Sequence, residues 1–161
     1  HIGAGDFSRE AWMFAQRHTR LLSALYGGLL PCDGILPYRL EFLCRFQPQG
    51  DSLYAYWGDR IYRRLMSEGD TVINLASGEY AKTVEPFLRE EDRYITCDFL
   101  TQKRGSLSMP AALAKMARGE MARFLVRERV ETPEELKGFQ WDGYRYSEIL
   151  SSKNRYVFVR G

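Results

Sequence analysis

Residues 71–84 read TVINLASGEYAKTV, and this stretch indicates the fold class. Its first part, Thr71 to Ala76, is short, apolar and rich in β-branched residues, which predicts a buried strand. The part from Ser77 to Val84 predicts a short helix that stops before Pro86, with Ser77 as its N-cap. A strand followed directly by a helix predicts a fold that mixes both kinds of element.

Outward from this stretch, apolar residues at 3.6-residue spacing predict three longer helices. They cover residues 7–25, ended by Gly27 and Gly28, residues 53–66, and residues 110–128. A short helix is predicted at 132–138, an extended segment at 38–46, and strands at 94–100, 106–109, 144–149 and 155–159. The strands at 94–100 and 106–109 predict a hairpin. The fold expected is one mixed α/β (α+β) domain, residues 1–161, with a small mixed sheet packed against amphipathic helices.

Composition narrows the class of protein. Hydrophobic residues make up 45% of the 161, enough for a packed core. No apolar run approaches the roughly 18–20 residues that a membrane span needs, and no secretion signal is seen. Cys32, Cys44 and Cys97 form no disulfide framework, which favours a reducing, cytoplasmic location. Because His1 stands in place of an initiator Met, we expect a segment of the protein to be missing upstream.

The charge balance is mild, with 23 basic residues against 21 acidic ones and a net charge of +2. Of the basic residues 18 are Arg, whose planar fork suits phosphate and base edges better than Lys does. A GC-rich genome would produce the same excess of Arg, so both interpretations stay open.

Residues for metal or nucleophilic chemistry are scarce. The histidines are His1 and His18 alone, there is no HExxH motif and no paired cysteine, so we expect no metal site and no cofactor. His18 falls on the apolar face of its predicted helix, where a half-buried histidine is expected. No glycine-rich phosphate loop of a known type is present.

Polar clusters near the predicted strands are the first candidates for a binding site. Alternation along residues 38–46 would place Arg39 and Glu41 on one side of a strand, either as a surface ion pair or lining a cleft. A second set lies at the carboxyl end of the strand at 71–76, where open α/β sheets bind ligands; it comprises Asn74, Ser77, Glu79, Tyr80 and Lys82. Ordinary loop polarity would also account for this second set.

A basic arc on the helix at 110–128 is the third candidate. It consists of Lys115, Arg118, Arg123 and Arg127, followed by Arg129. Over residues 110–129 five basic side chains stand against two acidic ones, a charge of +3. The arc would suit DNA phosphates, but a solvated helix face with basic residues near its C-terminus has the same pattern.

An ordered set of short motifs along nearly the whole chain resembles the YaaA-like peroxide-stress-response family of bacteria. The motifs are Leu22-Ser23-Ala24-Leu25-Tyr26-Gly27, Pro37-Tyr38-Arg39-Leu40-Glu41, Tyr56-Trp57-Gly58-Asp59, Val72-Ile73-Asn74-Leu75-Ala76-Ser77, Glu79-Tyr80, Ala117-Arg118-Gly119, Leu136-Lys137-Gly138-Phe139 and Gly143-Tyr144. Members of the family that carry aromatic residues before Lys115 differ from this chain, which has Ala111-Ala112-Leu113 there.

The resemblance implies a cytosolic protein of mixed α/β fold that protects cells from hydrogen peroxide by lowering the pool of unincorporated iron. It also implies DNA binding through a basic cleft and a helix-hairpin-helix element, the latter in the expected missing segment. Four residues carry over as candidate DNA contacts: Arg39, Lys115, Arg118 and Arg123.

The leading hypothesis is therefore a stress-response protein that binds duplex or junction DNA through these four residues, without a membrane or a stable metal as partner. An alternative is an enzyme acting on a nucleobase, nucleoside or phosphate compound. Its pocket would contain Arg39, Glu41, Asp59, Asn74, Ser77, Tyr80 and Lys82. Direct iron sequestration is disfavoured, because only hard oxygen ligands are plentiful.

Overall fold

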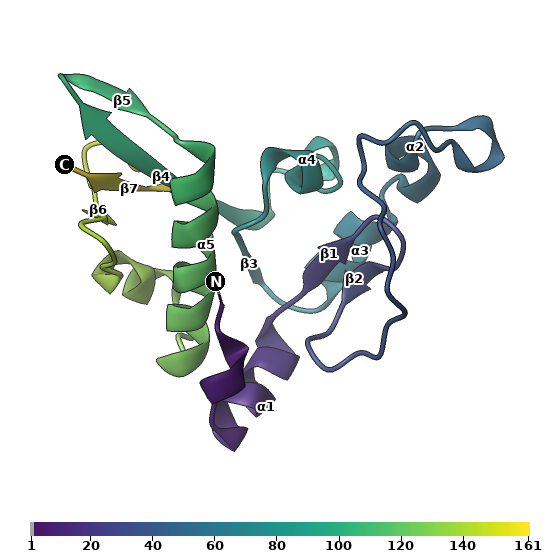
Figure 1. Cartoon of the computed structure of the whole chain (residues 1–161), viewed down its shortest axis with the longest axis horizontal. Helices are drawn as coiled ribbons and strands as arrows, with labels where there is room; N and C mark the ends of the chain where they lie inside the picture. The colour runs from purple at the N-terminus through teal and green to yellow at the C-terminus, as the bar shows by residue number, and fades with distance from the viewer. Residues whose placement is uncertain (1) are drawn as a thin grey trace. The chain divides into compact units, whose positions relative to one another are not determined.

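The computed structural model describes residues 2–161, which form two compact units (Figure 1). The first unit contains residues 2–14, Ile73–Leu75 and Tyr94–Gly161. The second contains Ala15–Val72 and Ala76–Arg93. Helices and strands are mixed, which confirms the predicted mixed α/β class. The organisation as a single domain stays a prediction.

The larger sheet has five strands in the order β3-β4-β7-β6, with β5 paired to β4. Its strands are β3 (Thr71–Asn74), β4 (Arg93–Lys103), β5 (Ser106–Ser108), β6 (Arg145–Tyr146) and β7 (Arg155–Arg160). The β4 and β7 strands run parallel, from Thr96 opposite Arg155 to Thr101 opposite Arg160. The pairs β4–β5 and β6–β7 are antiparallel, so the sheet is mixed, as predicted.

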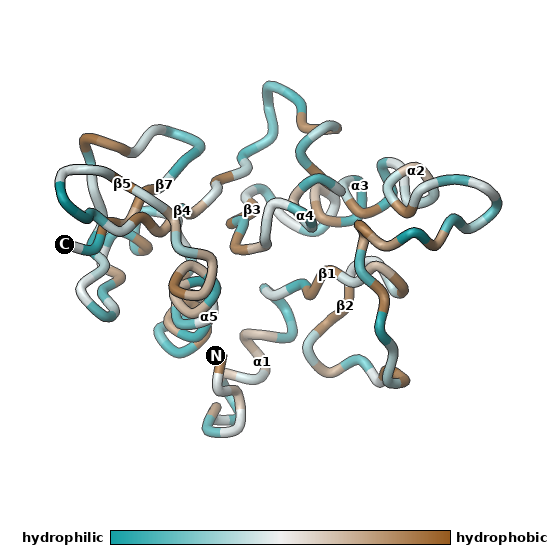
Figure 2. Tube along the Cα trace, turned by 45° about the horizontal axis from the view of Figure 1, so that its top comes forward, coloured by the Kyte–Doolittle hydropathy of each residue, from teal (hydrophilic) through white to brown (hydrophobic). Residues whose placement is uncertain are grey.

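The core of the first unit lies between this sheet and α5 (Ala111–Arg127). Along β4 the alternate residues Ile95, Cys97 and Phe99 are buried, as expected for a strand with one face on a core. From α5 the buried residues are Ala114, Ala117, Met121 and Val126. In Figure 2 brown and teal residues alternate along the coil of α5, which is typical of a helix with one buried and one solvated face.

Two shorter helices complete this unit. The 3-10 helix η4 (Pro133–Gly138) begins with a capping box between Thr132 and Glu135, so the short helix predicted there is confirmed. The hydrogen bonds from Thr132 lower the pKa of the Glu135 carboxyl below its usual range. The other is η1 (Ala4–Asp6), near the start of the chain.

The second unit has short elements. They are β1 (Leu21–Ser23), β2 (Gly27–Leu29), η2 (Pro48–Gly50), α2 (Leu53–Trp57), α3 (Arg60–Ser67), α4 (Gly78–Ala81) and η3 (Glu85–Phe87). Its buried residues include Phe42, Leu53, Ile61, Ala81 and Val84. The helix α1 (Arg9–His18) spans the boundary between the units.

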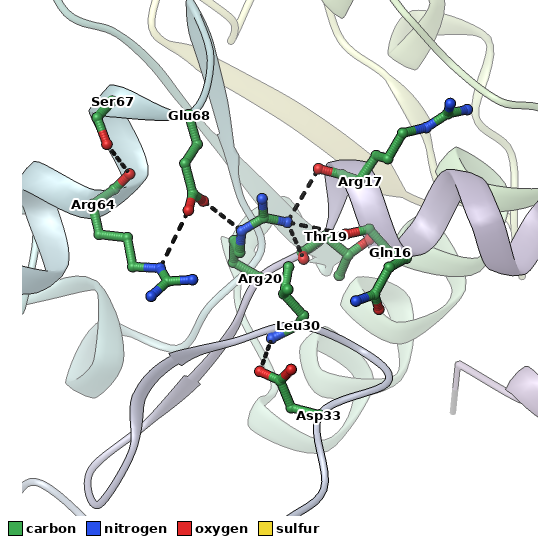
Figure 3. A network of polar contacts seen from close by, with 9 residues as sticks. All are labelled: Gln16, Arg17, Thr19, Arg20, Leu30, Asp33, Arg64, Ser67 and Glu68. Atoms are coloured by element: carbon green, nitrogen blue, oxygen red, sulfur yellow. Dashed lines mark hydrogen bonds and ion pairs between the residues drawn. The ribbon is translucent and has the colours of Figure 1, made fainter.

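The prediction of one helix over residues 7–25 is wrong, because α1 ends at His18. The Arg20 guanidinium donates to the carbonyl oxygens of Gln16 and Arg17, in the last turn of the helix, and of Thr19 just after it (Figure 3). These bonds satisfy carbonyl groups that a continuing helix would have bonded. The following residues instead form an antiparallel hairpin, in which Leu21 pairs with Leu29 and Gly27 adopts a φ of 76°.

Three other predicted elements differ from the structure. The helix over residues 53–66 is divided at Gly58, whose φ of 51° and ψ of −133° are not helical, into α2 and α3. Residues 38–46 form turns and no strand, so the alternation expected of Arg39 and Glu41 does not apply. The strand predicted at 144–149 is reduced to Arg145–Tyr146.

Candidate nucleic-acid interface

The solvent side of α5 carries the basic residues that the sequence singled out. Because Ala114 and Ala117 are buried, the neighbouring Lys115 is exposed and Arg118 half-buried. The Arg118 guanidinium lies 3.7 Å from the Met109 sulfur, just before the helix. Past these residues, Arg127 and Arg129 are also exposed. The helix thus buries its alanines and presents Lys115, Arg127 and part of Arg118 to solvent.

Arg123 has a different environment, because it holds the start of the chain against α5. Its guanidinium donates to the carbonyl oxygens of Ile2 at 3.0 Å and Gly3 at 2.7 Å, and it forms an ion pair with Asp6. Gly3 has a φ of 57°, and a Cβ there would lie 2.4 Å from an Arg123 nitrogen. A phosphate contact by Arg123 would therefore compete with bonds inside the protein, and it stays a prediction.

Replacing Arg123 by Ala is expected to release residues 2–6. The lost bonds to Ile2 and Gly3 should lower local stability by about 1–2 kcal/mol, since charge-assisted bonds are stronger than neutral ones but these are partly solvated. Hydrogen-exchange protection of the amides in this segment should fall about tenfold. The Lys115→Ala variant, which removes an exposed side chain of the same helix, should leave that protection unchanged.

The same contact predicts a pH dependence. The hydrogen bond from Arg123 and the guanidinium charge hold the pKa of the Asp6 carboxyl below its usual range. Because the folded pKa is the lower one, the stabilisation is complete above the unfolded pKa and is lost as pH falls through the folded pKa. Protection factors of residues 2–6 should therefore decrease below about pH 4 in the wild type. An equal decrease in an Asp6→Asn variant would contradict this assignment.

The remaining DNA-contact candidate, Arg39, is exposed on the turn-rich segment of the second unit. Lys115, Arg118 and Arg123 all belong to the first unit. One basic cleft that contains all four residues stays a prediction.

The proposed pocket residues are only partly brought together. Asp59 is paired with Arg63 at 2.7 Å on the surface of α3. Asn74 is buried and donates to the Thr96 hydroxyl at 3.3 Å, inside the first unit. Ser77 takes the N-cap position of α4, although its side chain makes no capping bond, and Lys82 is exposed at the other end of that helix.

Tyr80 and Glu41 do lie in one neighbourhood, around the buried ring of Phe42. Tyr80 meets Phe42 edge-on at 5.3 Å, and Tyr54 stacks on its other side at 5.2 Å. Burial, and then the charges of Glu79 and Glu41 and the nearby Tyr38 and Tyr54, raise the pKa of the Tyr80 hydroxyl. In the sequence, Phe42 is marked only as an aromatic residue directly after Glu41.

Glu79 fixes this neighbourhood through its backbone and its carboxylate. The Tyr54 hydroxyl donates to the Glu79 carbonyl oxygen at 2.9 Å, and a Glu79 carboxylate oxygen accepts from the Leu43 amide at 3.3 Å. The carboxylate of Glu79 is thus used to hold the loop around residue 43. No group of three His, Cys, Asp or Glu side chains within residues 2–161 is arranged to hold a metal ion.

Comparison with known proteins gives the family. The family model described as peroxide stress protein YaaA matches residues 1–150. The chain belongs to this family. Among its relatives, a UPF0246 protein of Clostridioides difficile (strain 630) is 42% identical over 99% of this chain and 65% of its own length. UPF0246 proteins of Agathobacter rectalis and Lactobacillus johnsonii are 43% and 45% identical over 65% and 63% of their lengths. The chain therefore spans slightly less than two thirds of these relatives.

Membership in a peroxide stress family draws attention to the cysteines, because peroxide oxidises thiolates. Cys32 and Cys44 are exposed, whereas Cys97 is buried in the core beneath α5. Burial, with the Asp98 charge, raises the pKa of the Cys97 thiol to about 12. At neutral pH this thiol therefore stays protonated and unreactive.

In the native chain the Cys32 and Cys44 thiols are therefore expected to react with iodoacetamide at pH 8, and the Cys97 thiol only after unfolding. Mass spectrometry of the alkylated peptides over time measures this directly. In a Cys97→Ala variant the two fast sites should keep their rates, and rapid native labelling of Cys97 would contradict the assignment.

Two further observations concern membrane-spanning helices and the exposure of His18. No helix within residues 2–161 is both long and apolar enough to cross a membrane. His18 is exposed rather than half-buried, so that prediction is wrong; it is the last residue of α1, and the apolar stripe that it was expected to join does not continue as a helix.

Proposed function

We propose that this chain takes part in the peroxide stress response by binding duplex DNA, with α5 as the element that contacts phosphates. The intact protein would limit damage by unincorporated iron and act in the bacterial cytoplasm, where the DNA lies. The observation that carries the proposal is the two-sidedness of α5, which buries Ala114 and Ala117 and presents Lys115 and Arg118 to solvent. The family to which the chain belongs is described as a peroxide stress protein, which supports the proposed role in that response.

Electrostatics supports α5 as the contact surface. Residues 110–129 carry a charge of +3, well above their share of the net charge of +2 for the whole chain. Lys and Arg side chains that meet phosphates release condensed counterions from DNA, and this release drives most non-specific binding. Phosphate contacts position a protein without reading bases, so weak dependence on DNA sequence is expected.

Fluorescence anisotropy of the chain with a labelled duplex, repeated at several salt concentrations, tests the proposal. If the four exposed or half-exposed cations Lys115, Arg118, Arg127 and Arg129 all meet phosphates, the logarithm of the association constant should fall against log salt with a slope of about −3.6. A junction DNA of equal length provides the comparison for preference of structure. Absence of binding at low salt, or binding that does not respond to salt, would contradict the proposal.

A second candidate function is an enzyme acting on a nucleobase, nucleoside or phosphate compound. The observation that favours it is the half-buried Tyr80, whose hydroxyl pKa is raised by burial and by Glu79 and Glu41. Perturbed groups of this kind are frequent in active sites. Thermal-shift measurements with a set of nucleosides and nucleotides, on the wild type and Tyr80→Phe, would test it. A stabilising compound whose effect is lost in the variant is the expected result, and no stabilisation by any of them would count against it.

A further inference from the structure

A shallow, open depression of about 600 Å³, here called the α3 groove, lies against the exposed face of α3 in the second unit. It is lined by Arg60, Arg63, Arg64, Ser67 and Glu68. The three arginines stand at i, i+3 and i+4, a spacing that places side chains on one face of a helix. Three guanidinium groups therefore share this groove with a single carboxylate.

The guanidinium of Arg60 is held in place by two aromatic rings. Its central carbon lies 4.9 Å from the ring centre of Tyr56 and 5.4 Å from that of Trp57, distances typical of cation–π contacts. Its Nε also donates to the Trp57 carbonyl oxygen at 3.0 Å. These contacts use the faces of the group and one N–H, so the two terminal nitrogens keep their donors for a ligand.

The support beneath Arg60 is itself fixed. The Trp57 indole nitrogen donates to the Ala24 carbonyl oxygen at 2.9 Å. The ring packs so closely on Gly27 that a Cβ at this residue would lie 2.8 Å from it. A group that is already ordered loses less entropy when a ligand binds, which favours affinity.

Two residues that line the groove, Arg64 and Glu68, belong to a charged network with Arg20 (Figure 3). Glu68 accepts a hydrogen bond from the Nε atom of Arg20 and forms an ion pair with Arg64, whose Nε lies 3.3 Å away. Since Arg20 also binds the end of α1, Glu68 is shared by two cations and cannot neutralise both. When Arg60 and the Arg63–Asp59 pair are added to this network, four arginines stand against two carboxylates, which leaves a charge of +2.

We propose that this α3 groove is a binding site for phosphate groups. Planar guanidinium forks match phosphate oxygens two at a time. Arg60 keeps the donors of both terminal nitrogens for a ligand. Arg63 is exposed and adds its remaining donors, since its Nη2 also pairs with Asp59 at 2.7 Å. Phosphate groups occur both in free phosphorylated compounds and in the backbone of nucleic acid, and the groove offers the same chemistry to either. The site shares no residue with the α5 surface and does not rest on the DNA-binding proposal.

Isothermal titration of the chain with inorganic pyrophosphate tests the site. Single Arg60→Gln and Arg63→Gln variants should each bind about tenfold more weakly, because each loses one bidentate charged contact. Arg60→Lys should lie between, since it keeps the charge without the fork. Arg64 is left intact because its loss would disturb the network around Glu68. The matched control is Arg89→Gln, an equal change of charge at an exposed arginine outside the groove, and it should bind as the wild type does.

The source of the phosphate is decided by two further titrations, with adenosine triphosphate and with a single-stranded oligonucleotide. If the Gln variants bind only pyrophosphate and adenosine triphosphate more weakly than the wild type does, the groove is assigned to free phosphorylated compounds. If these variants also bind the oligonucleotide more weakly, or bind only the oligonucleotide more weakly, the groove is assigned to nucleic-acid phosphates. If all three ligands bind the Gln variants and the Arg89→Gln control equally, or none binds the wild type, the proposal is overturned. A Lys115→Gln, Arg118→Gln variant should retain pyrophosphate binding, which separates this site from the α5 surface.

Discussion

Replacing Phe99 by Ala is expected to lower the free energy of unfolding by about 3–5 kcal/mol, the range for truncating a fully buried aromatic side chain. The Phe99 ring has no exposed surface. It stacks on Phe158 at 5.3 Å and meets Phe139 and Tyr144 edge-on at 6.1 and 5.7 Å. Its removal would leave a cavity at the centre of the core beneath α5, which surrounding rings cannot readily fill.

Urea denaturation followed by circular dichroism measures this loss. Phe46, whose side chain is 57% exposed, offers a control of identical chemistry, and Phe46→Ala should cost less than about 0.5 kcal/mol. A Phe99→Ala loss below about 1 kcal/mol would show that the ring does not pack as described.

Reversing the charge of both Lys115 and Arg118 to Glu is expected to weaken duplex DNA binding about 100-fold at low salt. Two attractive contacts would become repulsive ones, and juxtaposed like charges cost several kcal/mol. The fold should tolerate both changes, because Lys115 is exposed and the half-buried Arg118 donates to the sulfur of Met109 at 3.7 Å, a weak bond. Anisotropy titration at low salt measures the difference.

Lys153→Glu is the matched control for this experiment. Lys153 is exposed on the turn before β7 and belongs to the same unit as α5. The Lys153→Glu substitution lowers the net charge by the same amount as Lys115→Glu alone, but at a residue outside α5. An equal loss of affinity in Lys153→Glu and Lys115→Glu would indicate that overall charge, not α5, governs binding.

Elements with a strong local pattern could be predicted from the sequence. The strand predicted at 94–100 and the helix predicted at 110–128 each bury one face, and the structure confirms both as β4 and α5. The hairpin between β4 and β5 was also predictable, because Gly105, which adopts a φ of 81°, allows a tight turn between the two strands.

Elements decided by distant partners could not be predicted. Leu21 and Leu22 fit the stripe of a helix, yet they form β1 because residues 27–29 pair with them and Arg20 closes α1. Similarly, the apolar stripe of residues 53–66 continues across Gly58, so nothing in its spacing marks the break between α2 and α3. Local periodicity identifies a face to be buried, but not where the backbone must turn.

The candidate site shows the same limit. Lys115 and Arg118 were identifiable because charged side chains beside an apolar stripe are expected to reach solvent. Arg123 stands on the same helix, but its carboxylate partner Asp6 is 117 residues away in the sequence.

The arginines of the α3 groove share a face in the predicted helix as well, but their surroundings depend on distant partners. Glu68 binds Arg20, 48 residues away, and Trp57 donates to Ala24, 33 residues away.

Contact between α5 and DNA phosphates is tested most directly by the salt dependence of a neutral double variant. Log–log plots of association constant against salt should be measured for the wild type and for Lys115→Gln with Arg118→Gln. Removing two phosphate contacts should make the slope shallower by about 1.8. A slope equal to that of the wild type would show that neither residue meets a phosphate, and would contradict the proposed interface.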